Sequence, residues 1–147
     1  MNILFICTGN TCRSPMAQGL IETLAQERGL SIVASSAGLF AAYGAKVTPE
    51  AVEAVKDRVD ISGHESRPLK VELVNAADLV LALADDHKTV LLRQFPFDAD
   101  KIKTLAEWAG EEGDVTDPHG GSQEVYNHCA KTIEGLLKKG LESMADS

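Results

Sequence analysis

Short apolar runs alternate along the chain with segments whose apolar residues recur at helical spacing, and this alternation restricts the fold more than any other feature. The strand-like runs cover residues 2–6, 32–36, 79–83 and 101–105. The helix-like segments cover residues 14–28, 48–58, 85–95 and 122–141. Strands that alternate with helices are typical of a parallel sheet with helices on both faces. The sequence therefore predicts a single α/β domain, 1–147, with four parallel strands.

Residues that favour helix ends support these boundaries. Two of the expected helices begin with a cap residue followed by proline, at Ser14-Pro15 and at Thr48-Pro49. Proline is well placed there because the first N–H groups of a helix have no partner within the helix. Gly29 is a typical stop signal for the first helix.

The two later helices have different signals. Asp85 or Asp86 is expected to cap the third helix, because either carboxylate can accept a bond from an N–H group of the first turn. Apolar side chains at helical spacing are expected to face the core from the last helix: Val125, Cys129, Ile133, Leu136 and Leu137.

Charge and cysteine content exclude several classes of function. The net charge of −8 opposes binding to the phosphate backbone of nucleic acids and to anionic membranes. No apolar run is long enough to cross a membrane, and residues 2–6 are too short for an export signal. Three cysteines without a CxxC pair favour free thiols in a reducing compartment, the cytoplasm.

The segment Cys7-Thr8-Gly9-Asn10-Thr11-Cys12-Arg13-Ser14 joins the first strand to the first helix. A strand-to-helix junction brings several unpaired backbone N–H groups around one point, and the helix dipole adds to their attraction for an anion. Gly9 and Asn10 tolerate the positive φ that a tight cradle needs. Arg13 has a planar guanidinium that can donate two parallel bonds to phosphate oxygens.

Cys7 stands at the mouth of this cradle, at the carboxyl end of the first strand. The positive field of the loop favours its thiolate form, and a thiolate beside a bound phosphoryl group is a nucleophile for phosphorus. The alternative is an ordinary strand-to-helix turn with two half-buried cysteines, because a Cys followed six residues later by Arg is a weak motif when it stands alone.

The run Cys-Thr-Gly-Asn-Thr-Cys-Arg-Ser-Pro, together with Asp117-Pro118, resembles the low molecular weight protein tyrosine phosphatase family. The resemblance spans essentially the whole chain, with a particular likeness to the bacterial protein arginine phosphatases. It implies a four-stranded parallel sheet with helices on both sides. It also implies an enzyme without cofactor or metal that acts as a monomer on phosphorylated proteins.

By this resemblance Cys7 is the nucleophile that forms a phosphocysteine, and Arg13 binds the phosphoryl oxygens. Asp117 matches the general acid, which protonates the leaving group and then takes a proton from water. From the residues alone Asp117 is a turn residue, and Asp114 is an equal candidate. The expected phosphate-binding residues are Thr8, Gly9, Asn10, Thr11, Cys12, Arg13 and Ser14.

Four residues match positions that brace the loop in the family: Asn10, Ser14, Ser36 and His64. Asn10 is expected to hold an unusual backbone conformation, and Ser14 to donate a hydrogen bond to the thiolate. The alternatives are a helix cap for Ser14, a polar strand end for Ser36 and a surface histidine for His64.

Thr11 and Phe40 bear on the substrate. Tyrosine-directed relatives usually carry a larger aliphatic residue at the position of Thr11, whereas arginine phosphatases resemble this chain in having threonine. A hydroxyl suits a polar guanidinium better than an aliphatic wall does. Phe40 is expected to line the cleft beside the stem of the arginine, with core packing as its alternative.

The preferred hypothesis is therefore a protein arginine phosphatase, and the nearest alternative is a protein tyrosine phosphatase with the same mechanism. An arsenate reductase is less favoured, because residues 79–95 contain no further cysteine. A thiol sensor without enzymatic activity also remains open, because Cys7 and Cys12 could form a disulfide under oxidation. For Cys12 the alternative is a small buried side chain.

Overall fold

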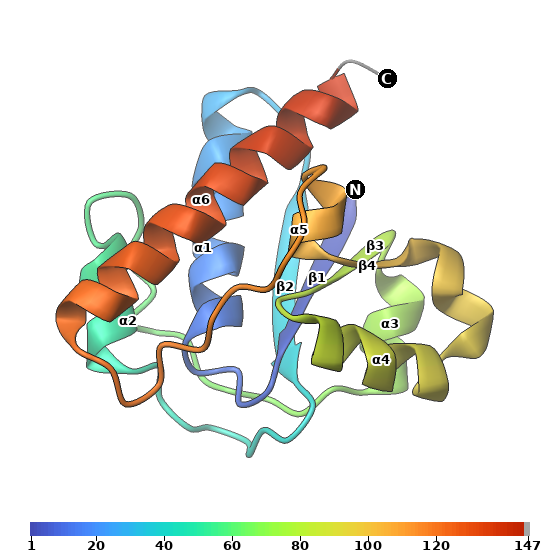
Figure 1. Cartoon of the computed structure of the whole chain (residues 1–147), viewed down its shortest axis with the longest axis horizontal. Coiled ribbons are helices and arrows are strands. Elements are labelled where there is room, and N and C mark those ends of the chain that lie inside the picture. The colour runs from blue at the N-terminus through green and yellow to red at the C-terminus, as the bar shows by residue number, and fades with distance from the viewer. Residues whose placement is uncertain (146–147) are drawn as a thin grey trace.

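Four parallel strands form the centre of the molecule in the order β2-β1-β3-β4. The computed structural model describes residues 1–145. The strands are β1 (Asn2–Cys7), β2 (Val33–Gly38), β3 (Leu79–Ala82) and β4 (Ile102–Thr104). The predicted α/β domain with four parallel strands is thus confirmed (Figure 1).

Helices cover both faces of this sheet because its central strands are apolar on both sides. In β1, Ile3 and Phe5 face one core, and Leu4 and Ile6 face the other. All four side chains are fully buried. The first core is covered by α1 (Arg13–Glu27), α2 (Pro49–Val55), α5 (Leu105–Trp108) and α6 (Gln123–Ala145). The second is covered by α3 (Val71–Ala76) and α4 (Asp85–Gln94) (Figure 1).

The strand order reverses at β1. The chain first adds β2 on one side of β1 and then adds β3 and β4 on the other side. β1 pairs with β2 on one side and with β3 on the other. Cys7 lies opposite Gly38, and Ile6 lies opposite Ala82. In doubly wound sheets the crevice outside the carboxyl ends of such strands is the usual ligand site.

The first helix begins two residues earlier than predicted, because Pro15 was expected to be its first residue. α1 starts at Arg13 with Cys12 in the cap position, so Ser14 is not the N-cap. The Ser14 hydroxyl contacts the Cys7 thiol instead of an N–H group of the first turn. The stop signal is confirmed: Gly29 has φ +66, and the N–H of Leu30 donates to the carbonyl of Ala25 at 2.8 Å.

The start of α2 is capped by the residue that precedes it in the chain. Thr48 caps α2 as predicted, with its side chain accepting from the N–H of Ala51 and Pro49 in the first helical position. The helix ends at Val55, three residues before the predicted end.

The third predicted helix, α4, begins at Asp85, and neither of its aspartates provides the cap. A carboxylate from a distant segment does so instead, because Oδ1 of Asp114 accepts from the N–H of Asp85 at 2.8 Å.

The last helix confirms the predicted inner face except at its first position. Cys129, Ile133 and Leu137 are buried, whereas Val125 is 45% exposed. Its neighbour Tyr126 takes the inward place in the first turn and is 2% exposed.

Two short helices, α3 and α5, were not predicted. A capping box between Thr104 and Glu107 begins α5. A 3₁₀ helix, η1 (Pro96–Lys101), follows α4.

Candidate active site

The segment that follows β2 is hydrogen-bonded to the start of the loop between β1 and α1. The N–H of Leu39 donates to the carbonyl of Cys7, and the N–H of Phe40 donates to that of Thr8, each at 3.0 Å. Gly38 has no room for a side chain, because a Cβ there would lie 2.5 Å from the carbonyl oxygen of Thr8. The end of β2 therefore fixes the shape of the loop.

Asn10 is the residue that turns the loop. It has φ 57, the one positive φ among the non-glycine residues that the structure describes, and it is fully buried. Asparagine adopts this left-handed conformation more readily than most residues. Gly9, which was expected to share this role, does not have a positive φ.

The Asn10 side chain is oriented by its partners. Its Oδ1 accepts from the N–H of Arg67 at 3.1 Å, so its Nδ2 is the donating end. Nδ2 donates to Oγ of Ser14 at 2.8 Å and to Oγ of Ser36 at 3.0 Å. Ser36 in turn donates to Oε1 of Gln18 at 2.6 Å.

These bonds decide which way the Ser14 hydroxyl points. Its oxygen already accepts from Asn10, and Sγ of Cys7 lies 2.9 Å away. A hydroxyl has one proton to donate, so Ser14 donates it to the sulfur. The N–H of Asn10 also donates to this sulfur, at 3.3 Å. Two hydrogen-bond donors therefore point at the buried sulfur of Cys7.

His64 supports the loop from the other side. Its Nε2 lies 3.0 Å from the carbonyl oxygen of Asn10, and its ring is half-buried. Burial lowers the pKa of His64, although the bond to Asn10 opposes this effect. The neutral ring therefore donates from Nε2, because the carbonyl can only accept.

Arg13 lies under the loop and is 6% exposed. Its Nη1 donates to the carbonyl of Val115 at 3.0 Å, and its Nη2 lies 3.7 Å from Oδ2 of Asp117. Asp117 is half-exposed, and its Oδ1 accepts from the N–H of His119. The structure thus separates the two aspartates, because Asp114 caps α4 whereas Asp117 lies beside the guanidinium.

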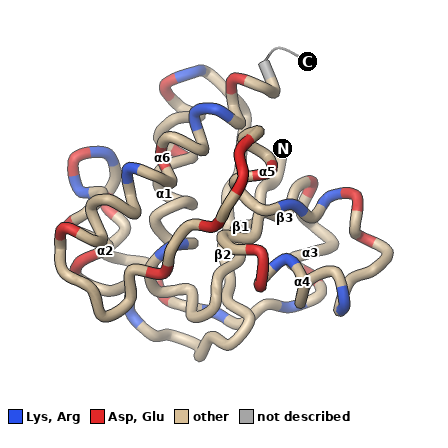
Figure 2. Tube along the Cα trace, in the orientation of Figure 1, with Lys and Arg blue, Asp and Glu red and all other residues tan. Residues whose placement is uncertain are grey.

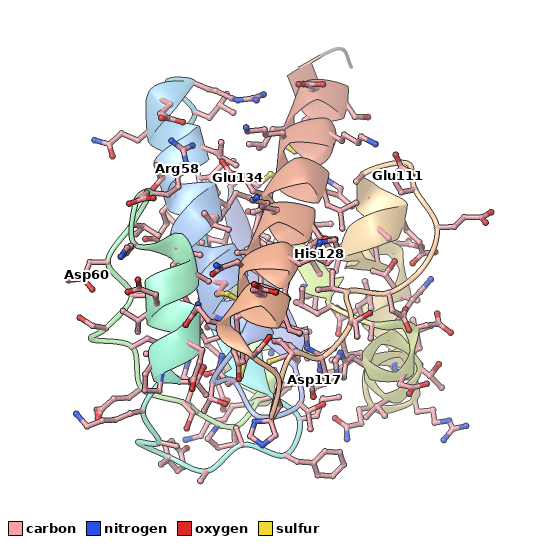
Figure 3. All side chains as sticks on the ribbon, turned by 60° about the vertical axis from the view of Figure 1, so that its left-hand side comes forward. Arg58, Asp60, Glu111, Asp117, His128 and Glu134 are labelled. Atoms are coloured by element: carbon pink, nitrogen blue, oxygen red, sulfur yellow. The ribbon has the colours of Figure 1, made fainter. Side chains whose placement is uncertain are left out.

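The connection from α5 to α6 brings Asp117 to the loop. The segment is anchored by a bond from the N–H of Val115 to the carbonyl of Leu83 at the end of β3. Figure 2 shows acidic residues spread along this connection. In Figure 3, Asp117 lies at the end of the molecule beneath the start of α6, whereas Glu111 lies near the opposite end of the same connection.

A pocket of about 220 Å³ opens above the loop. Its lining contains the expected nucleophile, the guanidinium and the carboxylate, and consists of Cys7, Thr8, Gly9, Thr11, Cys12, Arg13, Asp117 and His119. A sulfur with two hydrogen-bond donors, a fixed guanidinium and a carboxylate at the rim match the needs of phosphoryl transfer through a nucleophile and an acid.

Cys12 lies in the wall of this pocket, 6% exposed. Its sulfur is surrounded by three hydroxyl groups, with Tyr126 at 3.5 Å, Thr48 at 3.7 Å and Thr11 at 3.8 Å. Burial, and then the contact with Cys12, raises the pKa of Tyr126 to about 12. All three cysteines of the chain are free thiols.

A second cavity borders the pocket and shares Thr8, Arg13 and Asp117 with it. Phe40 lines this second cavity and is 80% exposed, so it does not pack in the core. His87 lines it as well, with Nε2 2.9 Å from Oγ1 of Thr8.

Every predicted site residue except Phe40 belongs to the loop, lines its pocket or is hydrogen-bonded to a residue of the loop. Sequence reasoning missed Gln18, Arg67 and His87. The position of His87 just after β3 was visible in the sequence. Its contact with the loop was not, because it requires β3 to lie next to β1.

No helix among residues 1–145, the part of the chain that the structure describes, is both long and apolar enough to span a bilayer. No group of three or more His, Cys, Asp or Glu residues in this part of the chain is arranged to hold a metal ion.

The sequence matches the family model "Low molecular weight phosphotyrosine protein phosphatase" over residues 2–147. A protein-arginine-phosphatase of Bacillus subtilis is 46% identical over 140 residues, which cover 95% of this chain and 93% of the relative. The low molecular weight protein-tyrosine-phosphatase PtpB of Staphylococcus haemolyticus is 37% identical and covers 93% of each chain.

Solved structures have the same fold. A YwlE arginine phosphatase mutant with a phosphorylated active-site serine has a TM-score of 0.94 and 43% identity, and covers 99% of this chain and 96% of that one. A low molecular weight protein tyrosine phosphatase from T. tengcongensis has a TM-score of 0.94 and 47% identity, over 97% and 99% of the two chains. The chain therefore belongs to the low molecular weight phosphotyrosine protein phosphatase family and is a cysteine-dependent phosphatase.

Proposed function

We propose that this phosphatase hydrolyses phosphoarginine in proteins through a phosphocysteine intermediate. The observation that carries the mechanism is the set of hydrogen bonds that makes Cys7 an acceptor, next to Arg13 and Asp117 in one pocket. The observation that carries the substrate is Thr11 in the wall of the same pocket.

In the first step the Cys7 thiolate attacks phosphorus, and an S–P bond forms while the P–N bond to the guanidine breaks. Asp117 gives its proton to the departing nitrogen. In the second step a water molecule loses a proton to Asp117 and attacks the phosphocysteine, which releases inorganic phosphate and restores the thiolate. The YwlE mutant with a phosphorylated active-site serine supports a covalent phosphoenzyme.

The loop supplies fixed donors for the charge that develops on the phosphoryl oxygens. The backbone N–H groups of residues 8–14 and the fork of Arg13 need no reorganisation during the reaction, because Gly38 and Asn10 hold the loop in shape. His64, Ser14 and Ser36 act as loop supports in this proposal.

Several features favour phosphoarginine over phosphotyrosine. Thr11 offers a hydroxyl to a polar guanidinium. The rim carries His119, and neither tyrosine of the chain lines the pocket, because Tyr126 is buried and Tyr43 lines a separate cavity. Phe40 presents an exposed ring beside the pocket for the stem of an arginine. Two relatives are named protein-arginine-phosphatases.

A protein tyrosine phosphatase is the second candidate, because the T. tengcongensis neighbour carries that name at comparable identity. Arsenate reduction is less favoured because it requires further accessible thiols. Burial raises the pKa of Cys129 to about 12, and its thiol faces the carbonyl of Thr116.

Cys12 is proposed as the partner of Cys7 under oxidation. A peroxide would convert the Cys7 thiolate to a sulfenic acid, and the Cys12 thiol would displace water to form a disulfide. A thiol reductant would then reduce this disulfide and restore both cysteines. Because all three thiols are free, we place the enzyme in a reducing compartment such as the cytoplasm.

The test is a comparison of kcat/KM on two peptides of one sequence, one carrying phosphoarginine and the other phosphotyrosine, with Cys7→Ser as the blank. We expect phosphoarginine to be preferred at least tenfold. A preference for phosphotyrosine would contradict the proposed substrate but would leave the proposed mechanism unchanged. Isolation of a phosphorylated thiol after rapid quenching tests the intermediate.

A further inference from the structure

His87 lies in the first turn of α4, where the chain leaves the carboxyl end of β3. Its side chain is 6% exposed, and its Nε2 lies 2.9 Å from Oγ1 of Thr8. Thr8 follows the Cys7 nucleophile and lines the phosphate pocket, whereas His87 lines only the neighbouring cavity. The hydrogen bond that links His87 to the lining of the phosphate pocket is therefore its bond to Thr8.

The other nitrogen of the ring, Nδ1, is buried and has no hydrogen-bond partner among the residues that the structure describes. A doubly protonated ring would bury an N–H group without an acceptor, which is costly. Burial, followed by the charge of Arg13 on α1, lowers the pKa of His87. The carboxylates of Asp86, Asp114 and Asp117 oppose this effect. The ring is therefore neutral at neutral pH.

A neutral imidazole ring carries one N–H proton, and the neighbouring groups determine whether Nδ1 or Nε2 holds it. With the proton on Nδ1, a buried donor would have no acceptor, and folded proteins leave buried N–H groups unpaired less often than acceptors. With the proton on Nε2, the ring donates to Oγ1 of Thr8. The Thr8 oxygen then accepts from His87, and the single proton of its hydroxyl is free for another acceptor.

We propose that His87 is a positioning residue which donates to Thr8 and thereby turns the Thr8 hydroxyl into a hydrogen-bond donor for a phosphoryl oxygen in the pocket. This inference rests on the proposed phosphatase site and adds a side-chain donor to its backbone N–H groups and Arg13. The same logic holds at Ser14, where the bond from Asn10 directs the hydroxyl proton to Cys7.

The first test reads the tautomer directly. Nitrogen-15 chemical shifts of the His87 ring in the full-length protein at pH 7.5 should show a protonated Nε2 and a bare Nδ1. The exposed residue His128 on α6, which does not line the pocket or the neighbouring cavity, provides the internal reference. A proton on Nδ1 of His87 would overturn the proposal, because Thr8 would then be the donor in this pair.

The second test measures the affinity of inorganic phosphate by calorimetry, which does not depend on turnover. Thr8→Val should weaken binding about threefold to tenfold, whereas Thr8→Ser should retain it within about twofold. His87→Ala should also weaken binding, and His87→Gln, which retains an N–H donor, should restore most of it. His128→Gln is the matched control and should bind phosphate like the parent.

The double variant separates positioning from a general structural role. If His87 acts through Thr8, then His87→Ala has no further effect on phosphate affinity in the Thr8→Val background, even if it lowers the melting temperature. Additive losses of affinity would contradict the proposal, as would an unchanged affinity of Thr8→Val. Neither result affects the comparison of phosphoarginine with phosphotyrosine, so the two proposals fail separately.

Discussion

The side-chain amide of Asn10 donates to Oγ of Ser14 at 2.8 Å, and this bond directs the Ser14 hydroxyl to the sulfur of Cys7. The amide itself cannot reverse, because its oxygen accepts from the N–H of Arg67. A backbone donor 60 positions after Cys7 thus fixes the direction of the bonds that end on the Cys7 sulfur.

Asn10→Asp should remove the donor while preserving the shape of the side chain. The Ser14 hydroxyl would then donate to the new carboxylate instead of to Cys7, and a negative charge would lie near the sulfur. We expect kcat on an aryl phosphate to fall about a hundredfold. The rate at which Cys7 is alkylated at pH 7 should fall as well. Asn127→Asp, on the exposed side of α6, is the control and should leave both measurements unchanged.

Asp117→Asn should slow leaving-group departure by a factor on the order of 10² to 10⁴, because an amide has no acidic proton to give. The loss should be smaller for an aryl phosphate with an acidic phenol, since that leaving group needs less protonation. Asp114→Asn should alter kcat only slightly, because Asp114 caps α4. If Asp114→Asn proved the more damaging of the two on every substrate, the assignment of the acid would be wrong.

Thr11→Ile should shift the preference from phosphoarginine towards phosphotyrosine by on the order of tenfold in the ratio of kcat/KM values. The substitution removes a hydroxyl from the wall of the pocket and makes the pocket more apolar. Thr11→Val keeps the shape of the side chain without the hydroxyl, so comparison of the two variants separates polarity from size. An unchanged ratio in both variants would remove Thr11 from the explanation of specificity.

Gly38→Ala should distort the loop between β1 and α1, although Gly38 itself lies outside that loop. The new Cβ would lie 2.5 Å from the carbonyl oxygen of Thr8 and 3.1 Å from the N–H nitrogen of Asn10. We expect a loss of about 1–3 kcal/mol in the free energy of unfolding and a clear fall in kcat. Gly63→Ala is the matched control, because nothing lies within 4 Å of its Cβ. Urea unfolding and steady-state kinetics measure the two effects.

Protonation of His64 should destabilise the fold as the pH falls. Burial lowers its pKa in the folded state below 6.5, so the unfolded chain binds more protons just below that pH. The stabilisation is therefore complete above pH 6.5 and is lost as the pH falls through the folded-state value. His64→Gln keeps a donor for the carbonyl of Asn10. Its free energy of unfolding should fall less than that of the parent between pH 7.5 and 5. A parallel decline of both proteins would contradict the expectation.

Local patterns were sufficient for much of the fold. The apolar run in β1, the Thr48-Pro49 start of α2 and the Gly29 stop of α1 all act within a few residues of the chain, and each was predicted correctly. The misjudged start of α1 has a tertiary cause, because the Ser14 hydroxyl contacts Cys7 rather than its own helix. The cap of α4 likewise comes from Asp114, 29 positions away.

The sequence alone determined the α/β class, the loop between the first strand and helix, and the place of Cys7 and Arg13 at the two ends of that loop. Those features depend on neighbouring residues and on the period of the apolar pattern. Apart from the family resemblance, only the tertiary structure separated Asp117 from Asp114, and it alone showed that Gln18, Arg67 and His87 support the loop. Their roles depend on which strands are neighbours in the sheet and on the direction of buried hydrogen bonds, which no local pattern encodes.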